Sequence, residues 1–486
     1  MTTQFAAGTD TLVGDMAAIV GGDHVFADLP ARLAYARDRL PFGTFKIRAG
    51  TLPGTLPRLV VCPGDAAQVA AILSLSARDG FAVIPFGAGS GVLGGTIAVC
   101  NEVVVDLKRL NRLIAIDAIN GLATVEAGMN GGQFEAALNA QGWTAGHLPQ
   151  SLHMSTVGGW AACRGAGQAS TRYGKIEDIV VGLKAVLPDG RQLEVRAVAR
   201  RSVGPSIRDL FVGSEGTLGI ITELALRIWR RPETETGIVL ACPDLTAAWT
   251  AARRIIQAEL RPAVVRIYDA EESRQRTEGL SEFKARPILT MLVFAGSPRL
   301  AAIEQELALE ILAAQDCVVA SDAPYRHWQE NRYLSYSSKW QTAGHYMDTI
   351  EVSGSWSALP EMYRRMGAAV AAIHPQIHFG AHWSHVYVEG ACQYMTLRLP
   401  PMDDATALAL HARAWDEVER LTIEFGGSIA HHHGAGLFRG PWMRGELGVG
   451  LDVLQAVKNA LDPGNRLNPG KLGLRPAPGA IEVRHA

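Results

Sequence analysis

The apolar positions in the first half of the chain follow the spacing of short buried strands and of amphipathic helices. Residues 81–86 and 102–107 are short, mostly apolar runs, as expected for buried strands. Between residues 66 and 77 the apolar positions recur at helical spacing, and Asp65 just before them can cap a helix. The pattern predicts strands alternating with short helices over residues 56–232.

A different pattern begins after the cluster Arg230-Arg-Pro-Glu233, which marks a domain boundary. Longer helical patterns there alternate with strand-like runs, namely helices at 245–260 and 299–315 and strands at 264–268 and 288–294. Residues from about 405 to 475 add a long helix and a final helix near 453–461. This arrangement is typical of a compact α+β cap that covers a substrate pocket.

Composition narrows the class of protein. The chain has 486 residues, 48% of them hydrophobic and 19% charged, with a net charge of −2. Such a balance argues against nucleic acid or an anionic membrane as a partner. No apolar run approaches the roughly 18 residues that span a bilayer, and the start lacks the basic and apolar segments of a secretion signal. The six cysteines form no C-x-x-C pair, and the chain ends without Ser-Lys-Leu, so we expect a cytoplasmic protein.

Three glycine clusters carry the first chemical signal. They are Gly89-x-Gly91-x-x-Gly94, the segment Ser155-Thr-Val-Gly-Gly-Trp160 and the segment Gly213-Ser-Glu-Gly-Thr-Leu-Gly219. Glycine lets backbone N–H groups approach an anion without a side chain in the way. One such loop is common, but three in one domain indicate a long, phosphate-bearing cofactor.

The first cluster also matches the dinucleotide fingerprint of nicotinamide enzymes. That fingerprint requires a helix of some ten residues after the loop, yet only a short link separates Gly95 from the strand predicted at 102–107. We therefore reject the nicotinamide interpretation. An ordinary turn remains the alternative for this loop taken alone.

Several segments together resemble a known family. Pro85-Phe-Gly-Ala-Gly-Ser90, Tyr173-Gly-Lys-Ile-Glu-Asp178 and the second and third glycine clusters resemble the FAD-binding domain of the vanillyl-alcohol oxidase superfamily, and within it the alkyldihydroxyacetonephosphate synthases and their bacterial relatives. The resemblance continues from about residue 30 to about 475, through Gly390-Ala-Cys-x-Tyr394 and the run from His431 to Gly434.

The resemblance implies an α+β fold with four parts. A lead-in over residues 1–55, which contains Phe42-Gly-Thr-Phe-Lys46, is followed by a PCMH-type, two-subdomain FAD-binding domain over 56–232. An α+β cap domain of the FAD-linked oxidase C-terminal type, with C-terminal helices, covers 233–475, and a tail covers 476–486.

FAD is the expected cofactor, and the glycine clusters are its expected site. The residues expected to bind it are Pro85, Gly87, Ala88, Gly89, Ser90, Gly91, Ser155, Thr156, Gly158, Gly159, Trp160, Arg164, Glu215, Gly216, Gly219 and Ile220. Family members that tether FAD often use a histidine in the first loop. Residues 87–96 contain neither histidine nor cysteine, so we expect non-covalent FAD.

The second chemical signal is a group of histidines in the cap. His382-Trp-Ser-His385, Tyr394 and His431 to His433 bring imidazoles and a phenol into a few short segments. Imidazole can accept or return a proton near neutral pH, which a flavin reaction needs. The resemblance implies proton chemistry at Tyr394 and His432, with His433 orienting its neighbour and His385 as a further candidate.

An arginine completes the predicted catalytic set. Pro262-Ala-Val-Val-Arg266-Ile-Tyr-Asp269 matches a family segment whose arginine lies over the flavin. Arg266 is therefore expected to steady the substrate or the reduced ring.

Other interpretations of the histidines stay open. They could form a satisfied structural cluster, or hold zinc for a metal-dependent hydrolase. Adjacent residues of a strand point to opposite faces, so His431 and His432 cannot converge without a sharp turn. No carboxylate or thiolate accompanies them in sequence, and we expect no metal. A non-catalytic flavin-binding protein is the remaining alternative.

One departure from the family bears on the reaction. The synthases carry a phosphate-binding arginine shortly before the segment that starts here at Asp348, whereas this chain has Tyr336-Ser-Ser-Lys339-Trp340. Lysine lacks the bidentate fork of arginine. We therefore predict an FAD-dependent oxidoreductase that oxidises a small alcohol or hydroxy acid by hydride transfer to flavin N5. The alternative is the synthase reaction, which forms an ether lipid precursor through a flavin N5 adduct. The expected partners are a small-molecule substrate and a second copy of the chain in a homo-oligomer, a dimer.

Overall fold

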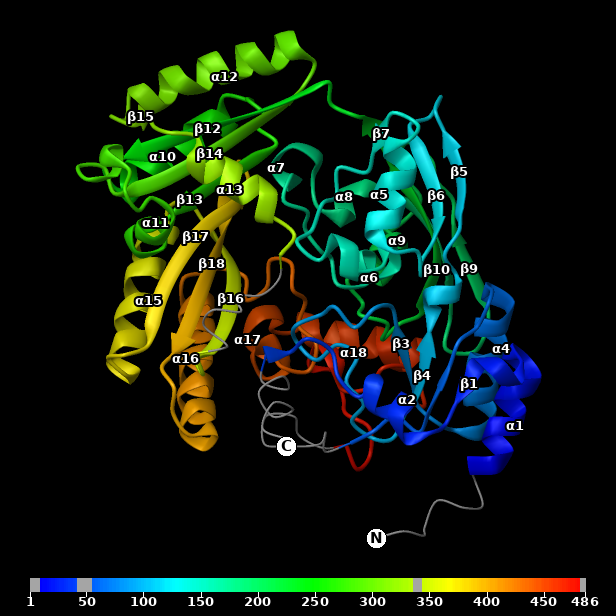
Figure 1. Cartoon of the computed structure of the whole chain (residues 1–486). Coiled ribbons are helices and arrows are strands. Elements are labelled where there is room, and N and C mark those ends of the chain that lie inside the picture. Colours follow the sequence, from blue (N-terminus) through cyan, green and yellow to red (C-terminus); the bar gives the residue numbers. More distant parts are fainter. Residues whose placement is uncertain (1–8, 42–54, 335–342, 481–486) are drawn as a thin grey trace.

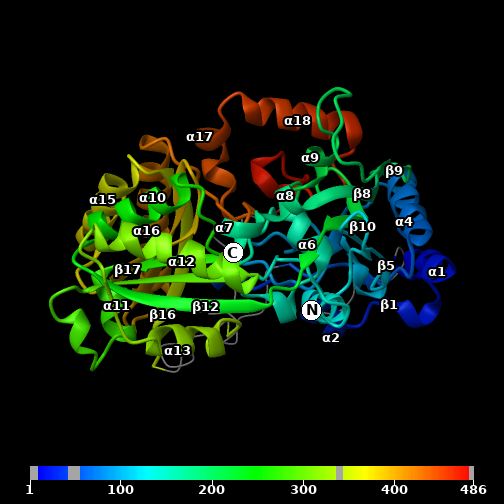
Figure 2. The same cartoon turned by 90° about the horizontal axis from the view of Figure 1, so that it is seen from above.

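The chain folds into two lobes that lie side by side, with the C-terminal segment packed beneath both (Figure 1). The computed structural model describes residues 9–41, 55–334 and 343–480. The first lobe spans residues 9–230 and the second residues 234–424; a view from above separates the same two lobes (Figure 2). None of the helices in the described part of the chain is long and apolar enough to cross a membrane.

The first lobe begins with a four-stranded sheet in the order β1-β2-β4-β3, in which β2, β4 and β3 are parallel. Its elements are α1 (Thr9–Val20), β1 (Val25–Phe26), α2 (Leu29–Ala34), β2 (Leu59–Val61), α4 (Ala66–Asp79), β3 (Val83–Phe86) and β4 (Val103–Asp106). The Asp65 side chain accepts a hydrogen bond from the N–H of Gln68 and caps α4, as predicted. Residues 87–102, all described, contain no helix, which confirms the rejection of the dinucleotide-binding crossover.

The rest of the first lobe is built on a five-stranded antiparallel sheet in the order β5-β6-β10-β8-β9. Its strands are β5 (Leu113–Asp117), β6 (Leu122–Glu126), β8 (Val180–Val186), β9 (Gln192–Val195) and β10 (Ile220–Arg227), and β7 (Trp143–Thr144) pairs with β11 (Trp229–Arg230). Its helices are α5 (Gly131–Asn139), α6 (Val157–Ala162), α7 (Ser170–Tyr173), α8 (Ile176–Ile179) and α9 (Arg208–Phe211). The two sheets are the two subdomains expected from the sequence.

The second lobe is a seven-stranded antiparallel sheet in the order β15-β12-β14-β13-β17-β18-β16. Its strands are β12 (Thr234–Cys242), β13 (Val264–Tyr268), β14 (Ile288–Gly296), β15 (Val318–Val319), β16 (Tyr346–Ser355), β17 (His378–Val386) and β18 (Gly390–Leu399). Its helices are α10 (Leu245–Gln257), α11 (Ala270–Arg276), α12 (Pro298–Ala313), α13 (Ala323–Asn331), α15 (Leu359–Ile373) and α16 (Asp404–Glu424). The predicted α+β class is confirmed.

Strand pleating decides which side chains of the second lobe can form a site. In β13, Val265 and Ile267 belong to the core that includes α10, α12, α15 and α16. Val264 and Tyr268 pack on the opposite face, in a cluster that also contains Ala169 of the first lobe. Because side chains alternate along a strand, residues in phase with Val264 face the first lobe.

The C-terminal segment returns to the first lobe. After α17 (Met443–Leu447), the helix α18 (Gly450–Leu461) packs against the core of the five-stranded sheet. Leu467 then forms a parallel bridge with Val83 of β3. The predicted lead-in motif, residues 42–46, lies outside the described residues.

A buried lysine fixes this return. The Lys458 ammonium donates to the carbonyl oxygen of Thr217 at 2.8 Å, to Leu467 at 2.6 Å and to the Asp462 carboxylate at 2.7 Å. Neither Lys458 nor Asp462 is accessible to solvent.

We predict that Asp462→Ala destabilises the protein strongly, because it leaves the Lys458 ammonium buried without its counter-charge. The free energy of unfolding, measured in urea, should fall by about 3–5 kcal/mol. The matched control is Asp452→Ala on α18, the helix that also carries Lys458; the Asp452 side chain is 61% exposed, and its carboxylate pairs with Arg444 at the surface. Its expected cost is below about 1 kcal/mol, and equal costs for both variants would contradict the role given to Lys458.

Candidate active site

A cavity of about 900 Å³ opens between the two lobes and is lined by residues of both. It gathers almost every residue singled out in the sequence: Pro85, Gly87, Ala88, Gly89, Ser90, Gly91, Ser155, Thr156, Gly158, Gly159, Trp160, Glu215, Gly216, Gly219, Ile220, Arg266, His385, Tyr394, His432 and His433. Arg164 is not among the lining residues. Its half-exposed guanidinium lies 3.5 Å from the Glu177 carboxylate instead.

The three glycine clusters form one side of the cavity. Several of their glycines lie where two loops are in contact and a side chain would not fit. A Cβ on Gly216, whose φ is +73°, would lie 2.5 Å from the Pro85 ring. One on Gly158 would lie 2.6 Å from the Cβ of Ala127, and one on Gly87 would collide with the Thr156 hydroxyl. The loops therefore converge because these positions lack side chains.

Gly159 differs from its neighbours. A Cβ there would have only the Thr156 hydroxyl within 4 Å, at 3.1 Å, and the residue lines the cavity. The hydroxyl of Ser155 is already used within the protein, since it donates to the Ser151 carbonyl and accepts from the Trp160 indole at 2.7 Å. At these two positions the cavity thus offers backbone rather than side-chain groups to a ligand.

The opposite wall comes from the pleated face of the seven-stranded sheet. Arg266 of β13 lines the cavity; its guanidinium donates to the Tyr268 hydroxyl at 2.8 Å and lies 2.9 Å from Nε2 of His382 on β17. The His382 ring stacks on Tyr394 of β18 with centroids 4.8 Å apart. The alternation that buries Val265 and Ile267 therefore aligns an arginine, an imidazole and a phenol on one surface.

Tyr394 is poised as a hydrogen-bond donor. Its hydroxyl donates to Oγ1 of Thr349 at 3.1 Å, and its ring stacks on His432 with centroids 5.9 Å apart. Burial raises the pKa of Tyr394 well above its ordinary value, with nearby Glu351 adding to the rise. The phenol thus remains protonated at neutral pH.

The three consecutive histidines converge, contrary to the expectation for residues of a strand. Residues 431–433 follow a bend instead, with ring centroids 5.1 Å apart for His431 and His432 and 4.5 Å apart for His432 and His433. This segment, called here the histidine loop, is anchored by Glu351 of β16. One carboxylate oxygen accepts the N–H groups of His431 at 2.6 Å and His432 at 3.1 Å, and the other accepts that of His433 at 3.0 Å.

Glu351, which the sequence analysis did not find, holds the histidine loop in place. It is inaccessible to solvent and pairs with Arg439, which is also inaccessible, at 2.9 Å. Burial alone would raise the pKa of Glu351, but Arg439 and the histidine loop lower it to about 2. The only sequence signal is an acidic residue within an apolar strand, and its partners lie about 80 residues away along the chain.

Glu215 ties the histidine loop to the first lobe. Its two carboxylate oxygens accept the N–H groups of Ala435 at 2.6 Å and Gly436 at 2.8 Å. Burial raises the pKa of Glu215 to about 7, although these two hydrogen bonds act in the opposite direction. A residue predicted only to contact the cofactor thus also connects the lobes.

Four potential metal ligands lie close together near the histidine loop. Ligand atoms of Glu351, Cys392, His431 and His432 all fall within 4.8 Å of one another. Both Glu351 oxygens, however, already accept hydrogen bonds from backbone N–H groups, and burial raises the pKa of Cys392 well above its ordinary value. Coordination would have to break the bonds that hold the loop, so we assign Glu351 to holding the loop.

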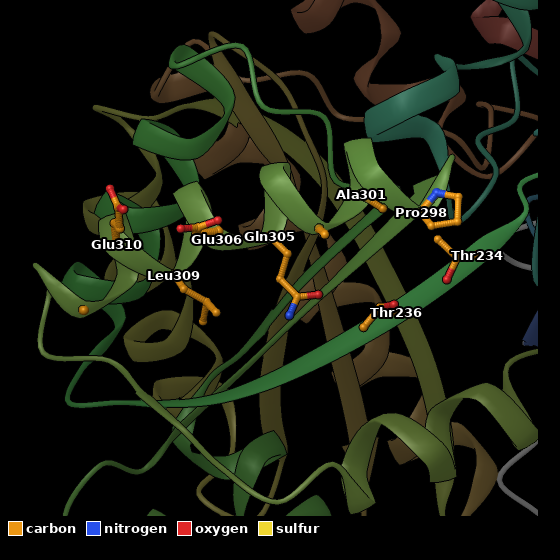
Figure 3. A pocket seen from close by; sticks show the side chains of 10 residues that line it. Thr234, Thr236, Pro298, Ala301, Gln305, Glu306, Leu309 and Glu310 are labelled. Carbon is orange, nitrogen blue, oxygen red and sulfur yellow. The ribbon is translucent and has the colours of Figure 1, made fainter.

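A second cavity, of about 540 Å³, lies between α12 and β12 (Figure 3). It is lined by Thr234, Thr236, Pro298, Ala301, Ala302, Gln305, Glu306, Leu309, Glu310 and Ala313. None of these side chains is a cation, a thiol or an imidazole. We therefore place the reaction in the cavity between the lobes.

Six neutral imidazoles in or beside the main cavity make the protein sensitive to acid. Burial, the largest cause in each case, lowers the pKa of His147, His382, His385, His431, His432 and His433. The pKa falls to about 3 for His147 and His385. Below pH 6.5 the unfolded chain therefore takes up protons that the folded chain refuses, and stability falls. Burial raises the pKa of Asp38 to about 6 and that of Glu215 and Glu419 to about 7, and these three carboxyls act oppositely but are fewer than the six imidazoles.

We predict that the free energy of unfolding in urea decreases between pH 7 and pH 5, since each neutral histidine costs about 1.4 kcal/mol per pH unit. His147 isolates the effect, because both of its ring nitrogens are buried without a hydrogen-bond partner. At pH 5 the acid-induced decrease in the free energy of unfolding should be about 2 kcal/mol smaller in His147→Phe than in the wild type. At pH 8, where histidine is neutral in both the folded and the unfolded chain, this pH-dependent difference should vanish. Identical pH profiles for the variant and the wild type would contradict this account.

Two family models together match most of the chain. Residues 57–196 match the model described as FAD binding domain, and residues 231–472 match that of FAD linked oxidases, C-terminal domain. Among solved structures, alkyldihydroxyacetonephosphate synthase superposes with a TM-score of 0.79 at 25% identity, over 96% of this chain and 86% of that one. p-Cresol methylhydroxylase superposes with a TM-score of 0.75 at 15% identity, over 96% and 97%, which shows the fold alone.

Relatives of known sequence cover 93–95% of the chain. The uncharacterized FAD-linked oxidoreductase YgcU of Escherichia coli (strain K12) is 30% identical over 95% of this chain and 98% of its own length. Alkyldihydroxyacetonephosphate synthase of Dictyostelium discoideum is 28% identical, over 93% and 78%. Glycolate oxidase subunit GlcD of Bacillus subtilis (strain 168) is 26% identical, over 93% and 95%. The chain therefore belongs to the family of FAD-linked oxidoreductases that join a PCMH-type FAD-binding domain to an FAD-linked oxidase C-terminal domain.

Proposed function

We propose that this enzyme binds FAD without a covalent link and oxidises a small hydroxy acid in the cavity between its lobes. The observation that carries the proposal is the cavity itself, which has glycine-rich backbone on one side and Arg266, Tyr394 and His432 on the other. FAD, when bound, supplies the acceptor for a hydride. The protein's part is then to bind the substrate, orient it and move its hydroxyl proton.

Non-covalent binding is supported by the first glycine loop and by the state of the cysteine in the cavity. The first glycine loop has no histidine or cysteine, and Cys163 is the cysteine that lines the cavity. Burial, followed by the nearby Glu215 carboxylate, raises the pKa of Cys163 to about 12. The sulfur therefore stays a thiol, which is a poor nucleophile.

The two proton-handling residues take different roles. His432 is a neutral imidazole, because burial and then the neighbouring His433 lower its pKa well below the ordinary value. Its Nδ1 lies 2.9 Å from Nδ1 of His431, which leaves Nε2 free for the cavity. We assign His432 as the base that accepts the substrate hydroxyl proton and Tyr394, which stays protonated, as a donor to the substrate oxygen.

Cationic side chains favour an acid over a neutral alcohol. Arg266, Arg276 and Arg332 all line the cavity. Arg276 is neutralised by Glu272 at 2.6 Å, and Arg332 lies 3.7 Å from Glu235. Arg266 forms no ion pair with a carboxylate of the described residues, so a substrate carboxylate would supply the missing charge. Glycolate oxidase among the relatives supports the same substrate class.

The synthase reaction is the second candidate, favoured by the synthase relatives at 28% identity and the TM-score of 0.79. Lys339, discussed above in place of the phosphate-binding arginine of the synthases, lies outside the described residues. Anaerobic screening of hydroxy acids and alcohols for bleaching of the bound flavin tests the first proposal. Ether product from an acyl-dihydroxyacetone phosphate and a long-chain alcohol, without net flavin reduction, would establish the second.

We predict that His432→Gln slows flavin reduction by about 10²–10⁴, because it removes the proton acceptor. Stopped-flow measurement of flavin bleaching by the acid found in the screen checks this. FAD content should not change, and a variant as fast as the wild type would exclude His432 as the base. His327→Gln on α13, which also lines the cavity, is the matched histidine control and should remain within a few-fold of wild type.

We predict that Gly159→Leu releases FAD from a folded protein. The leucine side chain would extend into the cavity, so it would occupy the space proposed for the cofactor without colliding with the backbone. The ratio of flavin to protein absorbance after gel filtration should drop at least tenfold, with the far-UV spectrum unchanged. Gly14→Leu, at an exposed position with no atom within 4 Å of a Cβ, should retain FAD. Full flavin content in the Gly159 variant would refute this placement.

A further inference from the structure

Two of the six cysteines face each other across the edge of the seven-stranded sheet. Cys242 is the last residue of β12, and Cys317 directly precedes β15, the short strand that pairs antiparallel with β12. Ala241 is paired with Val318 in this ladder. Because the chains run in opposite directions, the next step of the same register places Cys242 opposite Cys317.

The hydrogen bonds of the ladder fix the kind of pair that the two cysteines form. The Ala320 N–H donates to the carbonyl oxygen of Val239 at 2.9 Å, so these two residues form a hydrogen-bonded pair. Hydrogen-bonded and non-hydrogen-bonded pairs alternate along an antiparallel ladder, which makes Cys242 and Cys317 a non-hydrogen-bonded pair. The Cys317 N–H agrees with this position, because it donates to the carbonyl oxygen of Leu312 in α12, at 3.1 Å, rather than to β12.

The spacing and the direction of the two side chains suit a disulfide. Cα atoms of a non-hydrogen-bonded pair lie about 4.5 Å apart, and a disulfide spans roughly 4.4–6.8 Å between Cα atoms. Residues directly opposite each other point to the same face of a sheet, and both cysteines belong to the apolar core that contains Leu240. Both are free thiols in this structure. The Cys317 thiol is also the largest influence on the pKa of Cys242, which it lowers.

From this geometry we propose that Cys242 and Cys317 form a redox site, at which hydrogen peroxide converts the two thiols into a disulfide that fastens β15 to the end of β12. Two S–H bonds and the O–O bond break, one S–S bond forms, and both thiol protons end in the two water molecules released. The sulfur atoms give up two electrons and the peroxide takes them. A dithiol restores the thiols by exchange. The proposal is independent of the proposed function, because neither cysteine lines the cavity between the lobes.

Peroxide reaches these sulfur atoms when the edge of the sheet opens, because Cys242 has no exposed surface and Cys317 only 5%. The strand β15 pairs with β12 through two residues, Val318 and Val319, which are 37% and 61% exposed. Such a short pairing at a sheet edge opens locally far more easily than a core strand. Cys392, by contrast, is fully buried in β18, which lies between β17 and β16, and should stay reduced.

The disulfide would close a long loop of the second lobe. The segment between the two cysteines contains α10, α11, α12, β13 and β14. A cross-link across a loop of about 75 residues removes conformational freedom from the unfolded chain and so stabilises the fold. Oxidation should therefore make the second lobe harder to unfold.

Peptide mapping of the full-length, FAD-loaded enzyme tests the pairing. The protein is reduced, freed of reductant, treated with a small molar excess of hydrogen peroxide and unfolded in N-ethylmaleimide, which labels every remaining thiol. Mass spectrometry without reduction should find the Cys242 and Cys317 peptides linked, two hydrogens lighter than their sum, and separate again after a dithiol. Cys392 should carry the label. Retention of the label by both cysteines of the pair, their separate oxidation to sulfinic acids, or linkage to a different cysteine would overturn the site.

Thermal unfolding of the same holoenzyme tests the consequence. The melting temperature of the oxidised wild type should exceed that of the reduced wild type by about 4 °C or more, and a dithiol should reverse the rise. Cys317→Ser, a change of one atom, cannot form the bond and should show no rise. Cys62→Ser is the matched control, because Cys62 is a partly buried thiol of the first lobe, and this variant should respond as the wild type does.

A rise of equal size in Cys317→Ser would assign the effect to another oxidised group and overturn the proposal. A wild type that carries the mapped disulfide yet melts no higher would exclude the fastening of the edge. If Cys317→Ser does not fold, the peptide map of the wild type still decides whether the two sulfur atoms join, because it needs no variant.

Discussion

The Glu351 carboxylate is the group on which the geometry of the site depends. It is solvent-inaccessible, and its two oxygens accept three successive N–H groups of the histidine loop as well as the Arg439 guanidinium. Arg439 is shared with Glu419, which is also inaccessible, at 3.0 Å. A buried charge with several charge-assisted hydrogen bonds is costly to disturb, because loss of one partner leaves another unpaired. The bend that brings three consecutive imidazoles together is therefore held firmly by a residue that lies outside the cavity.

The same loop also joins the lobes. Its next two N–H groups, those of Ala435 and Gly436, are bound by Glu215 from the third glycine cluster. Asn468 of the C-terminal segment donates in turn to the carbonyl oxygen of Glu215 at 2.6 Å. One short stretch of backbone thus sets the distance between the glycine-rich side of the cavity and the wall that carries Tyr394 and His432. In the proposed oxidation the proton leaves the substrate hydroxyl oxygen and the hydride leaves the carbon bonded to it. A base and a bound cofactor need a fixed separation to take both from one substrate molecule.

The sequence predicted the elements of the fold well, because caps and periodicity are local. Asp65 and the strands around the first glycine loop are examples. It also predicted which residues meet, since glycine clusters and histidines are rare enough to stand out. It could not predict why several of the glycines are there. Gly216, for example, leaves room for the ring of Pro85, about 130 residues away, and so contributes to the cavity by letting two loops meet rather than by contacting a ligand. Nor could it find Glu351, a single carboxylate whose backbone partners lie about 80 residues away along the chain.

The proposed proton transfer and the stability of the fold impose opposite demands on this cavity. A desolvated wall keeps six imidazoles neutral, so His432 is available as the proposed base, but each proton that the folded chain does not take up in acid weakens the fold. His385 adds a strained backbone to that cost. Buried ion pairs at Glu351 and Lys458 hold the loop and the C-terminal segment in place, yet they are weak sources of net stability because their charges are desolvated too. The burial of apolar side chains in the large core of the seven-stranded sheet, which includes Trp383 and Trp415, therefore offsets the free-energy cost of the desolvated site.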